Sequence, residues 1–188
     1  MAVPEDREAR FRVLFEAGRS RLASYALRRT ESPEDAADVL AETFLIAWQR
    51  LEDVPEGEAG ILWLYATARH LLANQRRRLQ RQRLLVERLA SELGKAVAQT
   101  DAVDQSSLEA ARVLASLPAE DREILMLAGW EGLDSRGIGA VLGCSAVAAR
   151  IRLHRARGRM TAAASESFVA GTKHRHAVGD IPHEAASE

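Results

Sequence analysis

Apolar residues recur at helical spacing along most of this chain, and no stretch alternates apolar and polar positions as a strand would. One apolar stripe lies within residues 5–29, a second within 32–51, and a third in the first half of 59–93. Such spacing gathers apolar side chains on one face of a helix, so the pattern predicts an all-α fold without a sheet. The predicted buried residues are Phe11, Leu14, Phe15, Leu22 and Tyr25, then Leu40, Phe44, Ala47, Trp48 and Leu51, and then Ile61, Leu64, Tyr65, Ala68 and Leu72.

Local signals mark where these helices begin and end. Ser32 followed by Pro33 and two acids is a strong helix start, because serine caps the first turn and proline fits its first position. Residues 52–58 (EDVPEGE) are expected to form a loop. The second half of the third helix, QRRRLQRQR, has too few apolar residues for a deep core and is expected to be exposed.

The changes in pattern divide the chain into two predicted small helical domains. Residues 94–107 are small and polar without a helical stripe, so we expect a flexible linker between a domain at 5–93 and a second at 108–164. Residues 165–188 lack apolar periodicity and are predicted to be a disordered tail. Three histidines in that tail have no helical spacing and no cysteine partner, so we expect no metal site.

Residues 133–160 (LDSRGIGAVLGCSAVAARIRLHRARGRM) predict two helices around a tight turn. Gly143 stands where a helix end needs a left-handed residue, and Ser145 is placed to cap the helix that follows. Four apolar residues at helical spacing predict a buried stripe on the second helix. They are Ala149, Leu153, Ala156 and Met160.

The second of these helices is basic on its other faces. The arginines off the buried stripe are Arg150, Arg152, Arg155, Arg157 and Arg159. No acid occurs between Cys144 and Met160. A short helix, a turn and a basic second helix are the plan of a helix-turn-helix, whose second helix enters the DNA major groove. The alternative is a surface helix with a solvated arginine face.

Charge is segregated along the chain although the net formal charge is only −1. Residues 31–58 contain nine acids and one base, Arg50, whereas residues 69–88 contain seven arginines and one acid, Glu87. The basic segments suit phosphate, and the acidic one suggests a basic protein surface or simple solvation.

The remaining composition narrows the class of protein. The single cysteine, Cys144, excludes an internal disulfide and is typical of a reducing compartment. The chain has no basic-then-apolar leader and no apolar run of bilayer length, so we expect a cytoplasmic protein with no membrane partner.

Two separated stretches together resemble the sigma-70-type transcription initiation factors. DAADVLAETFLIAWQRL (35–51) with ILWLYATARHLLANQRRR (61–78) is similar to the conserved helical domain of that family. LASLPAEDREILMLAGWEGLDSRGIGAVLGCSAVAARIRLHRARGRM (114–160) is similar to its C-terminal promoter-binding domain. The short length and two-domain layout are similar to the extracytoplasmic-function (ECF) group, and the resemblance covers residues 11–160.

The resemblance implies a factor without catalytic chemistry or cofactor that binds core RNA polymerase and promoter DNA, with an anti-sigma factor as a further candidate partner. The first domain would dock on the clamp helices of the largest polymerase subunit and recognise and help open the minus-10 element. The implied polymerase-binding residues are Asp35, Asp38, Glu42 and Leu45. The implied minus-10 contacts are Arg69, His70, Asn74, Arg77 and Arg78.

The second domain would read the minus-35 element as a duplex. The implied contacts are Ser145, Ala146, Arg150, Arg152, Arg155 and Arg157. Arg150 and Arg152 lie in the N-terminal half, nearest the bases in a helix-turn-helix docking, whereas Arg155, Arg157 and Arg159 are expected to meet phosphates.

Other interpretations remain open for some of these residues. The acids of the second helix could instead stabilise their own helix dipole. Trp63 and Tyr65 could stack on unpaired bases, but their helical spacing favours core packing for both.

The sequence departs from the family pattern at several positions. The loop 52–58 has no aromatic residue, and His70 stands where relatives usually carry Asn. Arg136-Gly137 and Gly139 replace an acidic pair and an alanine, at a cost of about 1 kcal/mol for each glycine within a helix. On the recognition helix, the outer residues Val147, Ala148 and Ile151 can touch a thymine methyl but form no bidentate bond. The promoter sequence therefore does not follow from this chain.

Two rival functions are weaker. A stand-alone helix-turn-helix regulator would explain the C-terminal half but leave residues 35–78 without a role. A helical metal-dependent hydrolase would need Glu-x-x-His pairs on facing helices, and the sequence contains none.

Overall fold

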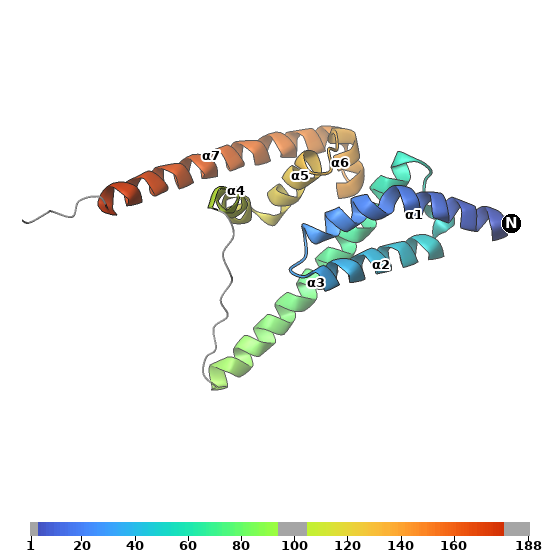
Figure 1. Cartoon of the computed structure of the whole chain (residues 1–188), viewed down its shortest axis with the longest axis horizontal. Helices are drawn as coiled ribbons and strands as arrows, with labels where there is room; N and C mark the ends of the chain where they lie inside the picture. The colour runs from blue at the N-terminus through green and yellow to red at the C-terminus, as the bar shows by residue number, and fades with distance from the viewer. Residues whose placement is uncertain (1–3, 94–104, 179–188) are drawn as a thin grey trace, which may run out of the picture. The chain divides into compact units, whose positions relative to one another are not determined.

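The computed structural model describes residues 4–93 and 105–178, and all regular structure in these ranges is helical (Figure 1). The all-α prediction is confirmed for this part of the chain. The elements are α1 (Pro4–Leu27), α2 (Pro33–Gln49), a 3-10 turn η1 (Leu51–Asp53), α3 (Glu58–Leu93), α4 (Gln105–Ser116), α5 (Ala119–Gly129), α6 (Ser135–Leu142) and α7 (Ala146–Val178).

The described residues fall into two compact units, which are described separately. The first lies within residues 1–99 and 131–149, and the second within residues 100–130 and 150–188. Residues 94–104, most of the predicted linker, lie outside the described residues, whereas residues 105–107 already belong to α4.

In the first unit α1, α2 and α3 pack against one another and enclose the core (Figure 1). The third predicted stripe is buried throughout, from Ile61 to Leu72. In α1 the prediction is right for Leu14, Leu22 and Tyr25 but wrong for Phe15, which is 40% exposed. The ring of Phe15 lies 4.7 Å from that of Phe44, so one edge packs while the rest stays in solvent.

The start of α2 forms as its sequence predicts. Ser32 has an extended backbone, and its hydroxyl oxygen accepts a hydrogen bond from the backbone N–H of Asp35 at 3.0 Å. That hydroxyl in turn donates to the Asp35 carboxylate at 2.9 Å. Pro33 occupies the first helical position, where no backbone N–H is needed.

Glu131 anchors the segment before α6 to the α1–α3 bundle of the first unit. Its carboxylate accepts hydrogen bonds from Arg29 at 2.7 Å and Arg28 at 3.2 Å, and the Glu131 and Arg29 side chains are almost fully buried. Helix α6 packs on α3, where a Cβ added to Gly137 would lie 3.5 Å from Leu62. That distance is an ordinary van der Waals contact, so α6 and α3 approach closely at position 137 without excluding a Cβ.

The second unit is held by apolar residues of α4, α5 and α7 and by one ion pair. Its buried residues include Val113, Leu117, Ile124, Leu127, Leu153 and Ala156. Arg159 of α7 donates twice to the carboxylate of Asp121 in α5, at 2.5 and 2.7 Å. This bidentate pair fixes α5 against α7.

The predicted tail begins too early. Sequence analysis places irregular chain from residue 165, but α7 continues to Val178. Three consecutive alanines, 162–164, favour helix strongly, and the first proline beyond them is Pro182. Helix propensity therefore extends α7 past residue 165, although the apolar periodicity of the sequence has ended. Residues 179–188 lie outside the described residues.

Candidate nucleic-acid interfaces

The acidic side of α2 is mostly on the surface. Asp38 and Glu42 are exposed, and Leu45, one turn further along the same face, is 54% exposed. Asp35 differs because it is half-buried and accepts a hydrogen bond from Gln75 of α3 at 2.6 Å in addition to its bond from Ser32. Asp35 thus serves the fold of α2 and α3, and Asp38, Glu42 and Leu45 form the free part of this face.

A cavity of about 400 Å³ between α2 and α3 brings two predicted groups of residues together. Asp38 and Glu42 line it from α2, and Asn74, Arg78 and Arg81 line it from α3. Acids implied in polymerase binding therefore lie beside the side chains implied in minus-10 contacts. The acids lower the local positive potential of this part of α3.

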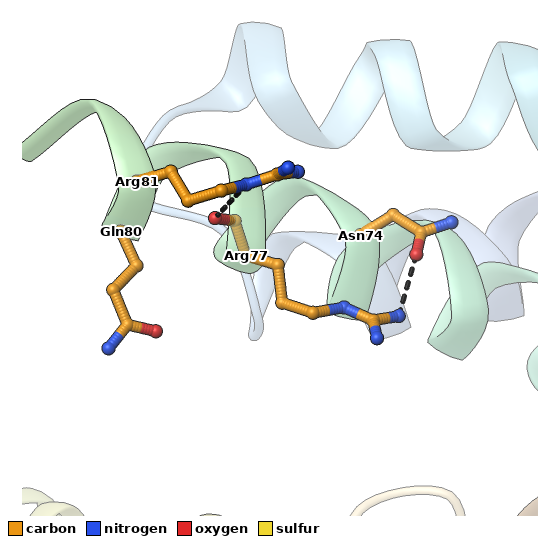
Figure 2. Close-up of a pocket in the computed structure, with 4 residues that line it drawn as sticks. All are labelled: Asn74, Arg77, Gln80 and Arg81. Atoms are coloured by element: carbon orange, nitrogen blue, oxygen red, sulfur yellow. Dashed lines mark hydrogen bonds between the residues drawn. The ribbon is translucent and has the colours of Figure 1, made fainter.

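Two arginines in the basic half of α3 donate hydrogen bonds within their own helix. Arg77 donates to the side-chain oxygen of Asn74 at 2.7 Å, and Arg81 donates to the backbone oxygen of Arg77 at 3.3 Å (Figure 2). With Gln80 these residues line an open cavity of about 590 Å³. His70, Asn74, Arg77 and Arg78 are exposed, and Arg69 is half-buried.

The aromatic residues at the start of α3 serve the core to different extents. Tyr65 is 2% exposed and its ring lies 4.9 Å from that of Tyr25, which confirms core packing. Burial raises the pKa of Tyr65, and a hydrogen bond with Arg21 opposes that rise. Trp63 is half-buried, so part of its ring stays accessible.

Sequence analysis missed the residue that holds the loop between α2 and α3. Arg10 of α1 donates a hydrogen bond to the backbone oxygen of Val54 at 2.5 Å and approaches the carboxylates of Glu52 and Glu56 at 3.9 Å. The loop also passes close to α3, because a Cβ added to Gly60 would lie 2.6 Å from the Pro55 oxygen. The acid-rich loop was the only available signal, and nothing in the sequence marked Arg10 as its partner.

The roles predicted for Gly143 and Ser145 in the turn between α6 and α7 are confirmed, and Asp134 is a further cap that the sequence analysis did not name. Asp134 caps α6 by accepting a hydrogen bond from the backbone N–H of Gly137 at 2.8 Å. Gly143 ends α6 in the left-handed conformation, with φ of 68°. Ser145 then caps α7 by accepting from the backbone N–H of Ala148 at 3.1 Å.

Gly139 has a structural reason to replace the alanine common in the family. A Cβ at this position would lie 2.7 Å from the backbone oxygen of Cys144 and 3.3 Å from the backbone nitrogen of Ala146. The glycine lets the turn pass close to α6, which offsets its low helix propensity.

Helix α7 separates a buried stripe from an exposed basic surface. Ala149, Leu153 and Ala156 are buried as predicted, and Met160 is half-buried. Ala146 and Ser145 are exposed at the start of the helix. Four exposed arginines make no side-chain hydrogen bond or ion pair within the described chain, namely Arg150, Arg152, Arg155 and Arg157.

Arg159 does not share this free state. Its pair with Asp121 raises the pKa of the Arg159 guanidinium and engages two of its donors. Arg159 therefore helps to hold α5 against α7, and its contact with DNA phosphate stays a prediction.

Residues 4–93 and 105–178 contain neither a cluster of metal-ligating side chains nor a membrane-spanning helix. No group of three or more His, Cys, Asp or Glu side chains there could hold a metal ion. Within the same ranges, no helix is both long and apolar enough to cross a membrane.

Family models match both parts of the chain in order. The model described as sigma-70 region 2 matches residues 14–82, and the model described as sigma-70 region 4 matches residues 107–160. The first match contains α2 and the basic half of α3. The second contains α5, α6 and the first half of α7.

Curated relatives agree with these matches. The ECF RNA polymerase sigma factor SigF of Caulobacter vibrioides is 34% identical over 139 residues, which cover 72% of this chain and 75% of that protein. The probable RNA polymerase sigma factor RfaY of Xanthomonas campestris pv. campestris is 30% identical over 142 residues. That match covers 72% of this chain but only 36% of the longer relative.

Solved structures share the fold. The sigma factor RpoE from Bartonella quintana, crystallised with the anti-sigma factor NepR, has a TM-score of 0.58 at 21% identity and covers 85% of this chain and 96% of that one. CnrH, solved with the cytosolic domain of CnrY, has a TM-score of 0.56 at 25% identity, with 81% and 85% covered. With two sigma-70 regions in order and a relative of 34% identity, the chain belongs to the ECF group of the sigma-70 family and is a sigma factor, not a stand-alone regulator.

Proposed function

We propose that this sigma factor contacts core RNA polymerase through α2, the minus-10 element through α3, and the minus-35 element through α7. The observation that carries the proposal is the pair of exposed arginine surfaces, one in each matched region. The α7 surface has no acidic partner within the described chain, and the α3 surface stands beside the acids of α2. Arginines without protein partners are available to phosphates and base edges.

The proposed polymerase contact is the face formed by Asp38, Glu42 and Leu45. An exposed leucine next to two exposed carboxylates supplies both the apolar area and the charged edge that protein interfaces combine. The carboxylates favour a basic partner surface and speed its encounter. Asp35 supports this face indirectly. Its hydrogen bonds fix the start of α2 and hold α2 next to α3.

The proposed minus-10 contact is the exposed half of α3, with His70, Asn74, Arg77 and Arg78 on the surface. The hydrogen bond from Arg77 to Asn74 orders two of these side chains before DNA arrives. Arg69 is half-buried and is therefore less accessible to DNA than these four residues. The accessible part of Trp63 leaves room for a stacked base, whereas Tyr65 is too deeply buried for that role.

The proposed minus-35 contact is the first half of α7. The Ser145 cap orients the helix start, where the exposed positions nearest the bases in a helix-turn-helix docking are found. Arg150 and Arg152 follow within the next two turns, and Arg155 and Arg157 lie further along. This order supports base contacts for the first pair and phosphate contacts for the second.

An anti-sigma factor is also a proposed partner. RpoE and CnrH, which share this fold, were each solved with a second protein, the anti-sigma factor NepR and the cytosolic domain of CnrY. The exposed apolar residues Phe15 of α1 and Leu45 of α2 support binding of such a protein. Action on RNA polymerase and the single cysteine support a cytoplasmic location.

Run-off transcription across a promoter library tests the proposal. Core RNA polymerase is assayed with and without the full chain, and the start sites of the transcripts are sequenced. We expect transcripts that require the chain and that share two upstream elements. Promoter-independent transcription, or DNA binding by the chain with no effect on transcription, would contradict the proposal.

A matched pair of variants makes the assay specific. Arg152→Ala removes an exposed arginine without a partner in the described chain, and Arg19→Ala removes an exposed arginine of α1. Transcription should fall with Arg152→Ala and stay unchanged with Arg19→Ala. Equal decreases would show that total positive charge, not the α7 surface, controls promoter use.

A further inference from the structure

An apolar ridge lies on the outer side of the first turns of α7. Val147 and Ile151 are 56% and 46% exposed, and they stand one helical turn apart. At 3.6 residues per turn, Ala149 and Leu153 fall on the opposite side of the helix, and both are buried. The ridge therefore faces away from the buried stripe formed by Ala149, Leu153 and Ala156.

Arginines flank the ridge on both sides. The helical repeat places Arg150 and Arg157 on one flank and Arg152 and Arg155 on the other. All four are exposed and free of side-chain partners in the described chain, and the first acid along α7 is Glu166. The surface thus has an apolar centre with a positive row on each side.

This arrangement matches the cross-section of a major groove. The groove is about 12 Å wide and admits one helix, with phosphates along both edges and base edges on its floor. Arginines on two flanks reach the two phosphate rows, which leaves the centre of the helix against the bases. The apolar group that a base edge presents there is the C5-methyl of thymine.

We propose that Val147 and Ile151 form a methyl-reading ridge that selects thymine in the minus-35 duplex. This inference rests on the proposed function, because it requires that α7 enter the minus-35 major groove. It adds that part of the sequence preference comes from apolar contact, in addition to arginine hydrogen bonds.

Charge decides between DNA and a protein as the occupant of the ridge. A protein seated on Val147 and Ile151 would have to bring acids to both flanks, or leave four arginines partly desolvated without partners. Duplex DNA brings phosphates to both flanks and methyl groups to the centre. The ridge and its flanks together therefore fit the duplex.

Replacement of thymine by deoxyuridine tests the ridge, because it removes only the methyl group. The preferred minus-35 duplex is first selected from randomised DNA with polymerase holoenzyme that contains the full chain. Each thymine of the selected element is then replaced singly and binding is measured by competition. We expect about threefold to fourfold weaker binding at one or two positions, the ratio that corresponds to burial of one carbon group.

Variants of Val147 and Ile151 then show which residue contacts which thymine methyl group. Val147→Ala and Ile151→Ala keep α7 intact, because both residues are exposed and alanine favours helix. Each should bring the thymine-to-deoxyuridine ratio at its own position close to one. Val147→Thr, which keeps the branched shape but replaces a methyl by a hydroxyl, should give an intermediate ratio.

Arg157→Ala is the matched control on the same helix. It should weaken binding of the thymine and deoxyuridine duplexes equally and leave their ratio unchanged. If the parent still selects a minus-35 element but its thymine-to-deoxyuridine ratio is one at every position, the proposed thymine contact is wrong. The proposed function would then still stand. Failure to select any minus-35 element would overturn both.

An unchanged ratio in the Val147 and Ile151 variants, with weaker binding to core polymerase, would assign the ridge to a protein surface. That result would also overturn the proposal.

Discussion

The basic surfaces of α3 and α7 contain similar numbers of arginines but place them in different surroundings. On α3, Arg77 and Arg81 donate hydrogen bonds to the same helix, and Asp38 and Glu42 stand across a shared cavity from Arg78. On α7, four arginines have no partner in the described chain and surround two exposed apolar residues.

This difference in surroundings indicates a difference in what each surface recognises. The α3 arginines are hydrogen-bonded to their own helix, and nearby acids reduce their positive potential. Such a surface suits the phosphate backbone of DNA with unpaired bases, because phosphate contacts require charge in the right place and no fixed pattern of donors. Free arginines beside an apolar ridge suit a rigid duplex groove, whose edges present a fixed pattern. Total charge alone would not separate the two surfaces.

The largest effect is expected when the α2 acids beside the basic surface of α3 are replaced. Replacement of Asp38 and Glu42 by Arg should weaken core polymerase binding about tenfold or more, because it reverses the charge of the proposed contact. Helicity should be unchanged, since exposed charges contribute little to folding. Fluorescence anisotropy with labelled chain measures the binding constant.

A charge-matched control is available on other helices. Glu16→Arg with Glu166→Arg makes the same change in net charge at exposed positions of α1 and α7. Core binding by this control should match that of the parent. If both double variants bind core equally, the assigned α2 face is wrong.

The next effect concerns base preference on α7. Arg150→Ala should relax selectivity at one or two minus-35 positions, because an arginine bidentate to guanine discriminates by roughly 1–3 kcal/mol. Arg157→Ala should weaken all promoters about equally, as expected for a phosphate contact. Selection from randomised minus-35 duplexes with each variant makes the comparison, and the reverse outcome would reverse the docking of α7.

A smaller effect is expected from the arginines of α3. Replacement of Arg77 and Arg78 by Ala should lower the salt dependence of minus-10 binding, with the log–log slope reduced by about 0.7 to 0.9 for each phosphate that the variant no longer neutralises. Titration of salt in a binding assay on partly single-stranded promoter DNA measures the slope. An identical slope would assign both arginines to the solvated surface.

The smallest effect is expected in the pH dependence of stability that results from the burial of Tyr65 in the first half of α3. Burial raises the pKa of Tyr65, so its phenolate is favoured in the unfolded chain. The stability that Tyr65 contributes is therefore complete below its unfolded pKa of about 10 and declines as pH rises beyond it. Urea unfolding at pH 8 and above pH 10 should show a smaller decline for Tyr65→Phe, and equal declines would place Tyr65 in solvent.

Residues whose role is local were predictable from the sequence. The Ser32 cap, the left-handed Gly143 and the stripe from Ile61 to Leu72 all follow from nearest neighbours and helical period. The two basic segments were equally visible, because charge segregation needs no knowledge of the fold. These features defined the helices and both candidate surfaces.

Residues whose role depends on distant partners were not predictable. Arg159 looked like its neighbours in sequence, and only the position of Asp121 on α5 separates it from the free arginines. Arg10 and Gln75 likewise gain their roles from the loop after α2 and from Asp35. Phe15 fits the apolar period of α1, yet it lies at the edge of the aromatic cluster.

Permanganate and DNase footprinting of one promoter complex test the division between α3 and α7 most directly. The parent holoenzyme should protect the minus-35 duplex and make thymines near the minus-10 element reactive. With Arg77→Ala and Arg78→Ala together, that reactivity should be lost and minus-35 protection should be retained. Loss of minus-35 protection with full thymine reactivity would contradict the assignment of α3 to opening and of α7 to duplex recognition.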